Sequence, residues 1–490
     1  MCFAMRGRAA WLVRLVVAAG TLVDCSGSSS APPSDGGSDG GPSEGTVASE
    51  AGAPTDAATS DASSIDATVG EGDGAMAGDA RVPLAPRCMR AADAGWPTPF
   101  DAGSAPDVAS LQQIVSGGGP VIHQPTFVSV TFPGDPYAPA LNDFVSSIGC
   151  TTYWSNLSDY GVGLAVGGTP VELTESAPAM IDDTMIGTWL AGKIDNGDPL
   201  FPRPAPDTVY VLWYPATTTA TQGGLVTCVS AGGFHGLTTL RDGTPIPYAV
   251  VPRCTSDAGD ANNVAYLVSS ASHELVETCT DPEPAPDVAY GLTDPNHLGA
   301  SIAGLSEIAD VCEGAQDAFV VPAGYPWPLQ RFWSNHAAWK GQNPCLPSAT
   351  TEYFYAAPIV TNTKAITVGS TGHTFTDQAA VVQIAVGSSV SIDVQVVSTV
   401  TGGGTIQVVA FDGTNFVNGG TPHLVLTWQT SGGSVSGDTG VTAQGGQTLK
   451  LGIQKSSADP SGVETFILFS SMVDGNGNTK RTFTWGLTAE

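Results

Sequence analysis

The residues best suited to chemistry are a histidine and two glutamates at positions 273–277. His273 and Glu277 are four residues apart, so on an α-helix their side chains point to the same side and can share one cation. Glu274 follows the histidine and could act as a general base toward a water bound to that cation. The pattern His-Glu-x-x-Glu differs from the His-Glu-x-x-His of zinc peptidases in its second ligand. Zinc accepts a carboxylate there, so the pattern predicts a divalent metal site, with zinc expected and calcium as the alternative.

The remaining ligands must come from another segment, and residues 306–313 offer two acidic side chains. We expect Glu307 to bind the metal and Asp310 to join the same metal cluster as the carboxylate that orients His273. The alternative is a capped, partly buried helix whose histidine and glutamates hydrogen-bond to loop backbone without any metal.

A helix over residues 263–279 is needed to position this motif. Asn262 or Asn263 can cap it, and Pro282 disfavours helix at Asp281, so the helix should end near Cys279. Its apolar stripe at helical period consists of Val264, Leu267, Val268, Ala271 and Leu275.

Strand-like and helix-like runs alternate around the motif. The strand-like runs are 127–132, 163–166, 209–214 and 248–251, and the helix-like runs are 140–148, 181–193 and 263–279. This alternation predicts a mixed α/β domain over residues 106–348, with helices packed on a sheet.

The motif and several segments around it resemble the exordium or phosphate-induced protein family and its secreted bacterial relatives. The matching stretches are His273-Glu274-Leu275, Glu277, Thr280-Asp281-Pro282, Glu307-Ile308, Asp310, Cys312-Glu313, a segment around Trp333 that ends in Cys345, and, upstream, Gly118 to Ile122, Phe127 to Phe132, Tyr153-Trp154, Tyr160 to Gly163, Cys228 and Gly232 to Gly236. They follow the order of the family over roughly residues 106 to 348.

The resemblance implies an extracellular protein with peptidase-like chemistry. It implies a polar cluster of His273, Glu274, Glu277, Asp281, Glu307 and Asp310. The order Glu-x-x-Asp is also similar to the second motif of gluzincin peptidases, with one residue fewer between the two acids.

Three other histidines are weaker candidates. His235, in a Gly-Gly-Phe-His-Gly run, could hydrogen-bond a reaction intermediate, but the glycines favour a turn. His297 could be an alternative metal ligand on a loop. His336 stands among aromatic residues that more often pack a core or line a groove.

Cysteine usage indicates an oxidising compartment. We expect the disulfides Cys228–Cys254 and Cys312–Cys345. The partners of Cys88, Cys150 and Cys279 stay open, and a zinc site built from cysteines is not expected, since no Cys-x-x-Cys spacing occurs.

The N-terminus predicts export. Residues 1–25 combine arginines with a short apolar run, as a signal peptide does, and Cys25 resembles a lipoprotein cleavage site, although Asp24 stands where a small residue is expected. Lipidated Cys25 would then be the only membrane attachment. Residues 26–105 are rich in Ser, Gly, Asp and Ala and predict a disordered acidic linker.

The net charge limits the possible binding partners, and the length limits the number of domains. The net charge of −29 argues against nucleic acid, because phosphate binding needs clustered Lys and Arg. With 490 residues the chain can hold two folded domains, and we expect a monomer.

Residues 349–490 predict an all-β antiparallel sandwich, because short alternating runs are separated by Gly, Ser, Thr and Asn turns. Trp428 and Trp485 could form a sugar-stacking face, but buried tryptophans are the favoured interpretation.

Two functions follow from these patterns. The first is a secreted or surface-tethered, metal-dependent hydrolase similar to zinc peptidases, acting on a peptide or on a cell-wall or matrix substrate. The second is a non-catalytic extracellular protein that binds cell-wall or matrix glycan or protein.

Overall fold

The computed structural model describes most of the chain from residue 87 onward. The described residues are 87–91, 94–100, 111, 113–254, 264–283, 288–291, 299, 306–313, 315, 318–370, 373–418, 421–459, 461–473, 477 and 479–490. The predicted signal peptide, most of the predicted linker, Cys25 and His297 lie outside these residues. None of the described helices is both long enough and apolar enough to cross a membrane.

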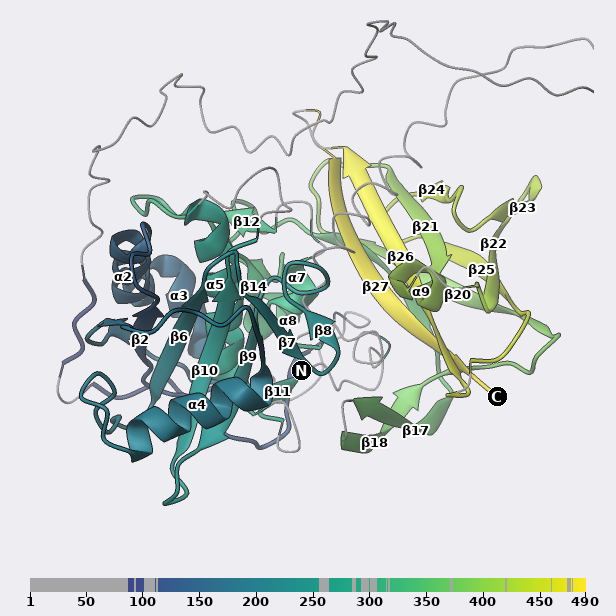
Figure 1. Cartoon of the computed structure of the whole chain (residues 1–490). Coiled ribbons are helices and arrows are strands. Elements are labelled where there is room, and N and C mark those ends of the chain that lie inside the picture. The colour runs from purple at the N-terminus through teal and green to yellow at the C-terminus, as the bar shows by residue number, and fades with distance from the viewer. Residues whose placement is uncertain are drawn as a thin grey trace, which may run out of the picture. The chain divides into compact units, whose positions relative to one another are not determined.

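The protein is rich in β-strands, and one mixed sheet carries the candidate site (Figure 1). Its strand order is β3 (Val166–Gly167), β2 (Thr126–Thr131), β6 (Thr208–Tyr214), β10 (Pro245–Pro252) and β9 (Phe234–Thr239), and β4 (Val171–Glu172) also pairs with β2. The neighbours β2, β6 and β10 run parallel, whereas β9 runs antiparallel to β10. The predicted strand 163–166 is largely absent, because only Val166 of it pairs with β2.

Side chains that alternate along β6 and β10 enter two different cores, as expected for strands buried on both faces. Val209, Val211 and Val251 pack with residues of α2 (Ala138–Ser147) and α5 (Val264–Thr280). Tyr210 and Leu212 pack with residues of α4 (Asp183–Asp195), which crosses the strands in Figure 1. Helices therefore cover both faces of this sheet.

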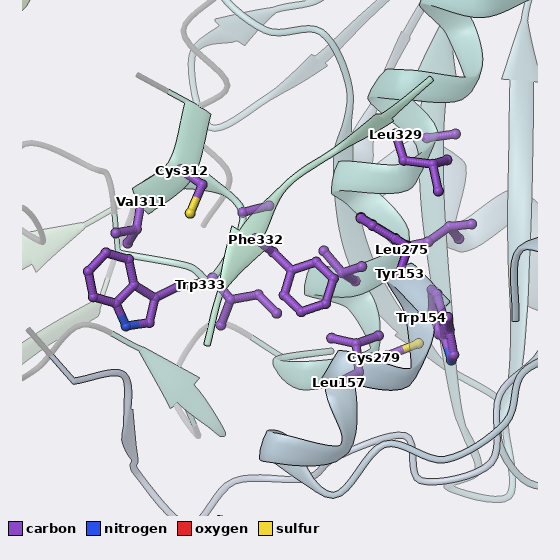
Figure 2. Packing of buried hydrophobic residues seen from close by; sticks show 14 of the residues in the cluster. Tyr153, Trp154, Leu157, Leu275, Cys279, Val311, Cys312, Leu329, Phe332 and Trp333 are labelled. Atoms are coloured by element: carbon purple, nitrogen blue, oxygen red, sulfur yellow. The ribbon is translucent and has the colours of Figure 1, made fainter. Parts of the chain in front are cut away.

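Helix α5 matches the predicted helix to within one residue at each end. Its apolar stripe is buried, and Figure 2 shows Leu275 and Cys279 among Tyr153, Trp154 and Leu157. The last turn closes with a hydrogen bond from Asp281 N–H to the Glu277 carbonyl at 2.7 Å. Pro282 follows directly, so the chain leaves the helix there.

Short elements surround this core. They are β1 (Val115–Ser116) with β11 (Tyr290–Gly291), β5 (Met180–Asp182) with β7 (Thr219–Gln222) and β8 (Leu225–Val226), β12 (Phe319–Val320) with β13 (Leu329–Gln330), β14 (Phe332–Trp333) with β15 (Cys345–Leu346), and the helical segments α3 (Thr152–Ser155), η1 (Ile148–Cys150), η2 (Asn156–Tyr160), α7 (Asp310–Glu313) and α8 (Asn335–Trp339).

Three disulfides are formed in the described part of the chain. Cys228–Cys254 and Cys312–Cys345 confirm the predicted pairs. The third bond joins Cys88 to Cys150, and Cys279 is a buried thiol.

The predicted linker ends earlier than residue 105. Cys88 is buried as well as disulfide-bonded, and the ring of Trp96 stacks on His123 with centroids 4.9 Å apart. Residues 87–91 and 94–100 are therefore attached to the domain through Cys88 and Trp96. The sequence from 26 to 86 contains no cysteine and no aromatic residue that could make contacts of this kind.

The strands from Phe354 onward form two five-stranded sheets that share one apolar core, which fits the predicted sandwich. One sheet has the order β16 (Phe354–Ile359), β20 (Ser389–Ser398), β25 (Thr448–Lys455), β22 (Leu424–Thr430) and β23 (Gly433–Ser436). The other has the order β19 (Val382–Gln383), β27 (Thr479–Ala489), β26 (Val463–Val473), β21 (Ile406–Asp412) and β24 (Val441–Ala443). A hairpin of β17 (Thr363–Ser370) and β18 (His373–Ala380) and the short helix α9 (Gly413–Asn418) complete this part.

Trp428 and Trp485 are both buried, as favoured from the sequence, so neither offers a sugar-stacking face. No described sheet combines strands from before and after Leu346, and a domain boundary at 348/349 stays a prediction.

Candidate metal centre

The centre is built around two side chains of α5 that lie one turn apart. His273 Nε2 is 2.9 Å from Glu277 Oε2, the arrangement that the four-residue spacing predicts. Both side chains are buried, and burial alone would lower the pKa of the imidazole. The neighbouring carboxylates, first Glu277, outweigh that effect and raise the pKa of His273 well above its usual value.

The acidic segment 307–310 is attached to the same helix by its backbone. Glu277 Oε1 accepts the N–H groups of Ala309 and Asp310 at 3.3 and 3.2 Å. One carboxylate thus faces the imidazole with one oxygen and holds the start of α7 with the other. These hydrogen bonds confirm the prediction that the segments 273–277 and 307–310 meet at one place.

Asp310 is the acid of that segment that faces His273. Its Oδ1 lies 3.6 Å from His273 Nε2, and this oxygen accepts no hydrogen bond within the described residues. Burial first, and then the like charge of Glu277, raises the pKa of Asp310 well above its usual value. A buried carboxylate oxygen without a donor is costly unless a proton or a cation satisfies it.

The two distances from His273 Nε2 are each compatible with a pair of ligands on one divalent cation. With metal–ligand bonds of about 2.1 Å, two ligand atoms lie about 3.0 Å apart in octahedral and about 3.4 Å apart in tetrahedral geometry. The separations of 2.9 Å and 3.6 Å from His273 Nε2 are close to these values. Among the described residues, two sets of donors have ligand atoms that all lie within 4.8 Å of one another, and they are His273, Glu274 and Glu277, and His235, Glu277 and Glu307. Asp310 is in neither set, and its carboxylate approaches the centre at His273 Nε2. One imidazole nitrogen and several carboxylate oxygens form a donor set that zinc accepts.

Gln330, at the end of β13, contacts the other nitrogen of the His273 ring. Its Nε2 lies 2.8 Å from His273 Nδ1 and donates to the Ala309 carbonyl at 3.2 Å. The expectation that Asp310 orients His273 is therefore corrected: Asp310 faces Nε2, where a cation would bind, and the amide of Gln330 orients the ring through Nδ1.

Glu307, expected as a metal ligand, lies beside His235. Its Oε1 is 3.3 Å from His235 Nε2. Glu307 belongs to the set of possible donors formed with His235 and Glu277, and His273 is not part of that set. His235 also contacts Glu274, with Nδ1 3.6 Å from Oε2. His235 therefore lies between Glu274 of the His-Glu-x-x-Glu motif and Glu307 of the Glu-x-x-Asp motif.

His235 lies in strand β9 and not in a turn, so the turn interpretation is wrong. Its Nε2 is 3.0 Å from the Asp281 carbonyl, and because a carbonyl only accepts, Nε2 must carry a proton. Nε2 is therefore not available as a metal ligand in this arrangement. Burial lowers the pKa of His235, but Glu307 and Glu274 outweigh it and raise that pKa to about 9.

Asp281 closes this side of the cluster. Burial first, and then Glu307, raises the pKa of Asp281 to about 7. Its Oδ1 accepts the Ala289 N–H at 2.8 Å. Asp281 therefore ties the chain after α5 to the segment that follows, and its carboxylate interacts electrostatically with His235.

Glu274 is packed against the backbone of the sheet. A Cβ at Gly233 would lie 2.7 Å from Glu274 Oε1 and 2.8 Å from the Val250 carbonyl. Gly233, just before the first residue of β9, is therefore needed for the close approach of this segment to α5 and β10. The Gly-Gly-Phe-His-Gly run carried this information, whereas nothing in the sequence pointed to Gln330.

The cluster is closed to solvent. Among its five predicted site residues, His273 is the most exposed and keeps 3% of its surface, and Glu277 and Asp310 keep 0%. His336, by contrast, is exposed near the start of α8, with its ring centroid 4.8 Å from that of Phe100.

Comparisons with known proteins add little. No family model and no curated protein matches the chain. Among solved structures, domains 4 and 5 of the S-layer protein SbsC are similar over 30% of this chain and 82% of that chain, at 13% identity and a TM-score of 0.14. A catalytically inactive OgpA from Akkermansia muciniphila, in complex with the O-glycopeptide glycodrosocin, is similar over 78% of this chain and 97% of that chain, at 9% identity and a TM-score of 0.19. TM-scores this low carry no argument, so the exordium-like resemblance stays an expectation from the sequence.

Proposed function

We propose that this chain is an exported protein whose mixed α/β domain binds one divalent cation, with zinc expected, and uses it to hydrolyse a peptide or another wall or matrix substrate. The observation that carries the proposal is the set of buried donors around His273 Nε2, namely Glu277 Oε2 at 2.9 Å and Asp310 Oδ1 at 3.6 Å. His273, Glu277 and Asp310 would hold the cation, and Glu307 would stand beside it.

Glu274 is the base in this proposal. A bound zinc supplies Lewis acidity and makes water easier to deprotonate near neutral pH. In this proposal Glu274, which follows a proposed ligand in the chain, takes that proton. Its contacts with Gly233 and His235 restrict the side chain and support this role. Export is supported by three disulfides, which fit an oxidising compartment.

A second function has its own support. Every donor in the cluster is buried, and structural metal sites are closed whereas catalytic ones keep an open position. In that case the cation would add to the hydrogen bonds that already hold the 307–313 segment on α5, and the protein would be a non-catalytic extracellular binding protein.

Metal content tests the proposal first. The protein purified without a metal-binding tag should carry close to one zinc per chain, and His273→Asn and Asp310→Asn should each lose most of it. Glu313→Gln is the matched control, because Glu313 lies in the same short helix and should keep the metal. A content below about 0.1 per chain in the unmodified protein, with none taken up on dialysis against zinc, would remove the metal site from the proposal.

Glu274→Gln then separates the two functions. For a hydrolase we expect full metal content and a loss of about 10²-fold or more in cleavage of a peptide library. Unchanged cleavage would reject Glu274 as the base. Full metal content in the unmodified protein with no cleavage of peptide or wall substrates would favour the structural site.

A further inference from the structure

Gln330 connects the two segments that form the proposed metal centre. Its backbone N–H donates to Ser272 Oγ at 2.8 Å, so the residue is fixed beside α5. Its side-chain nitrogen lies 2.8 Å from His273 Nδ1 and 3.2 Å from the carbonyl of Ala309, and the residue is buried. A neutral amide at this place was not singled out by any sequence pattern.

We infer that Gln330 is a positioning residue that sets the metal affinity of the centre by orienting His273 and fixing which ring nitrogen faces the cation. This inference rests on the proposed metal site. Hydrogen-bond partners of ligating histidines commonly have this effect, and losing one costs about 10- to 100-fold in metal affinity.

The argument starts from what an amide can donate and accept. The amide nitrogen only donates, and the Ala309 carbonyl only accepts, so the nitrogen of Gln330 must point toward that carbonyl. When the ring is neutral, His273 Nδ1 accepts from the same nitrogen and the ring proton is on Nε2. That proton faces Glu277 Oε2, at the position proposed for the cation.

A cation bound to Nε2 requires the other tautomer of His273. Nε2 must then offer its lone pair, so the ring proton sits on Nδ1 and needs an acceptor. A half-turn of the Gln330 amide presents Oε1 to Nδ1 and gives up the bond to Ala309. Glutamine can therefore serve the ring in both states, but it loses one hydrogen bond when the centre is loaded.

Two substitutions distinguish this role from simple packing. Gln330→Glu keeps the shape and offers only acceptors, which suits the Nδ1 proton of a metal-bound ring. Gln330→Met fills a similar volume and offers neither strong donor nor acceptor. If Gln330 merely fills space, Gln330→Glu should be the more harmful change, because it adds a buried negative charge close to Glu277 and Asp310.

The experiment is zinc affinity, measured on the full chain by competition with a chromogenic chelator. We expect Gln330→Met to weaken zinc binding about 10- to 100-fold, and Gln330→Glu to bind zinc at least as tightly as the unmodified protein. Thermal unfolding in the presence of a chelator monitors folding of each variant. Weaker zinc binding by Gln330→Glu than by Gln330→Met, or a change of less than about twofold in Gln330→Met, would overturn the inference.

The result also separates this inference from the proposed function. If the unmodified protein binds no zinc, the proposed metal site fails and the inference falls with it. If the unmodified protein binds zinc and both variants match it, the metal site stands and only the role of Gln330 is rejected.

Discussion

His235 Nδ1 lies 3.6 Å from Glu274 Oε2, and this contact joins strand β9 to helix α5 inside the protein. The same ring reaches Glu307 through Nε2 at 3.3 Å. A single histidine thus sits between two acids that are 33 residues apart in the chain, and several measurable properties should depend on it.

The stability of the metal-free protein should depend on pH through His235. Its pKa in the folded protein is raised to about 9 from 6.5. A raised pKa of this kind adds stability that is fully present below pH 6.5 and is lost as the pH rises through 9. We expect the difference in unfolding free energy between the unmodified protein and His235→Gln to fall by an amount on the order of 3 kcal/mol over that range.

Denaturant unfolding with a chelator present, at pH values from 6 to 10, measures this difference. Groups that titrate alike in both proteins cancel in the comparison. A difference that stays constant over the whole range would show that His235 does not carry the charge assigned to it.

Gly233→Ala should displace Glu274 because the added Cβ would lie 2.7 Å from Oε1 of that side chain. We expect a stability loss of about 1–3 kcal/mol and, if the centre is catalytic, a fall in activity with the metal retained. Gly192→Ala is the control, since Gly192 lies inside α4 with nothing within 4 Å of its Cβ position. That change should stabilise by up to about 1 kcal/mol. Equal behaviour of the two variants would contradict the close approach at Gly233.

Removing the Cys312–Cys345 disulfide should weaken metal binding as well as stability. Cys312 lies two residues after Asp310 in α7, so the bond restrains the acid that faces His273. Replacing both cysteines by alanine should cost about 2–4 kcal/mol of unfolding free energy and reduce zinc affinity. The same replacement at Cys88 and Cys150 should lower stability but leave zinc affinity unchanged. Equal zinc affinity in both double variants would argue that α7 is held by other contacts.

Lys455→Met should destabilise the C-terminal sheets strongly. Lys455 Nζ lies 2.9 Å from Glu464 Oε2, and both side chains are 0% exposed. Removing the lysine leaves a buried carboxylate uncompensated, which typically costs 3–5 kcal/mol. Lys450→Met, on the same strand, breaks only an exposed pair with Asp393 and should change stability by less than about 1 kcal/mol. Denaturant melts of the two variants that agree within error would contradict this assignment.

The sequence predicted the features that depend on short-range pattern. The helix carrying His273 follows from an apolar stripe at helical period and from Pro282, and it ends within a residue of the expected position. Two disulfides were also predicted correctly, at Cys228–Cys254 and Cys312–Cys345. The meeting of Glu277 with the 307–310 segment followed from the residue types at the two motifs.

The finer arrangement could not be obtained in this way, because it depends on how distant segments pack. Glu307 and Asp310 are both acids, and only the start of α7 at Asp310, with its N–H bound to Glu277, decides which of them faces His273. His235 reaches the cluster because β9 pairs antiparallel with β10, a pairing that its neighbouring glycines do not reveal. Gln330 is neutral and 57 residues away from His273, so no spacing rule identifies it.

The double use of Glu277 has one further consequence. Since Oε1 of Glu277 accepts hydrogen bonds from the N–H groups of residues 309 and 310, the acidic segment 307–310 should stay attached to α5 when the cation dissociates. Binding and release of the cation would then change the backbone very little, and the metal-free protein should present a preorganised binding site.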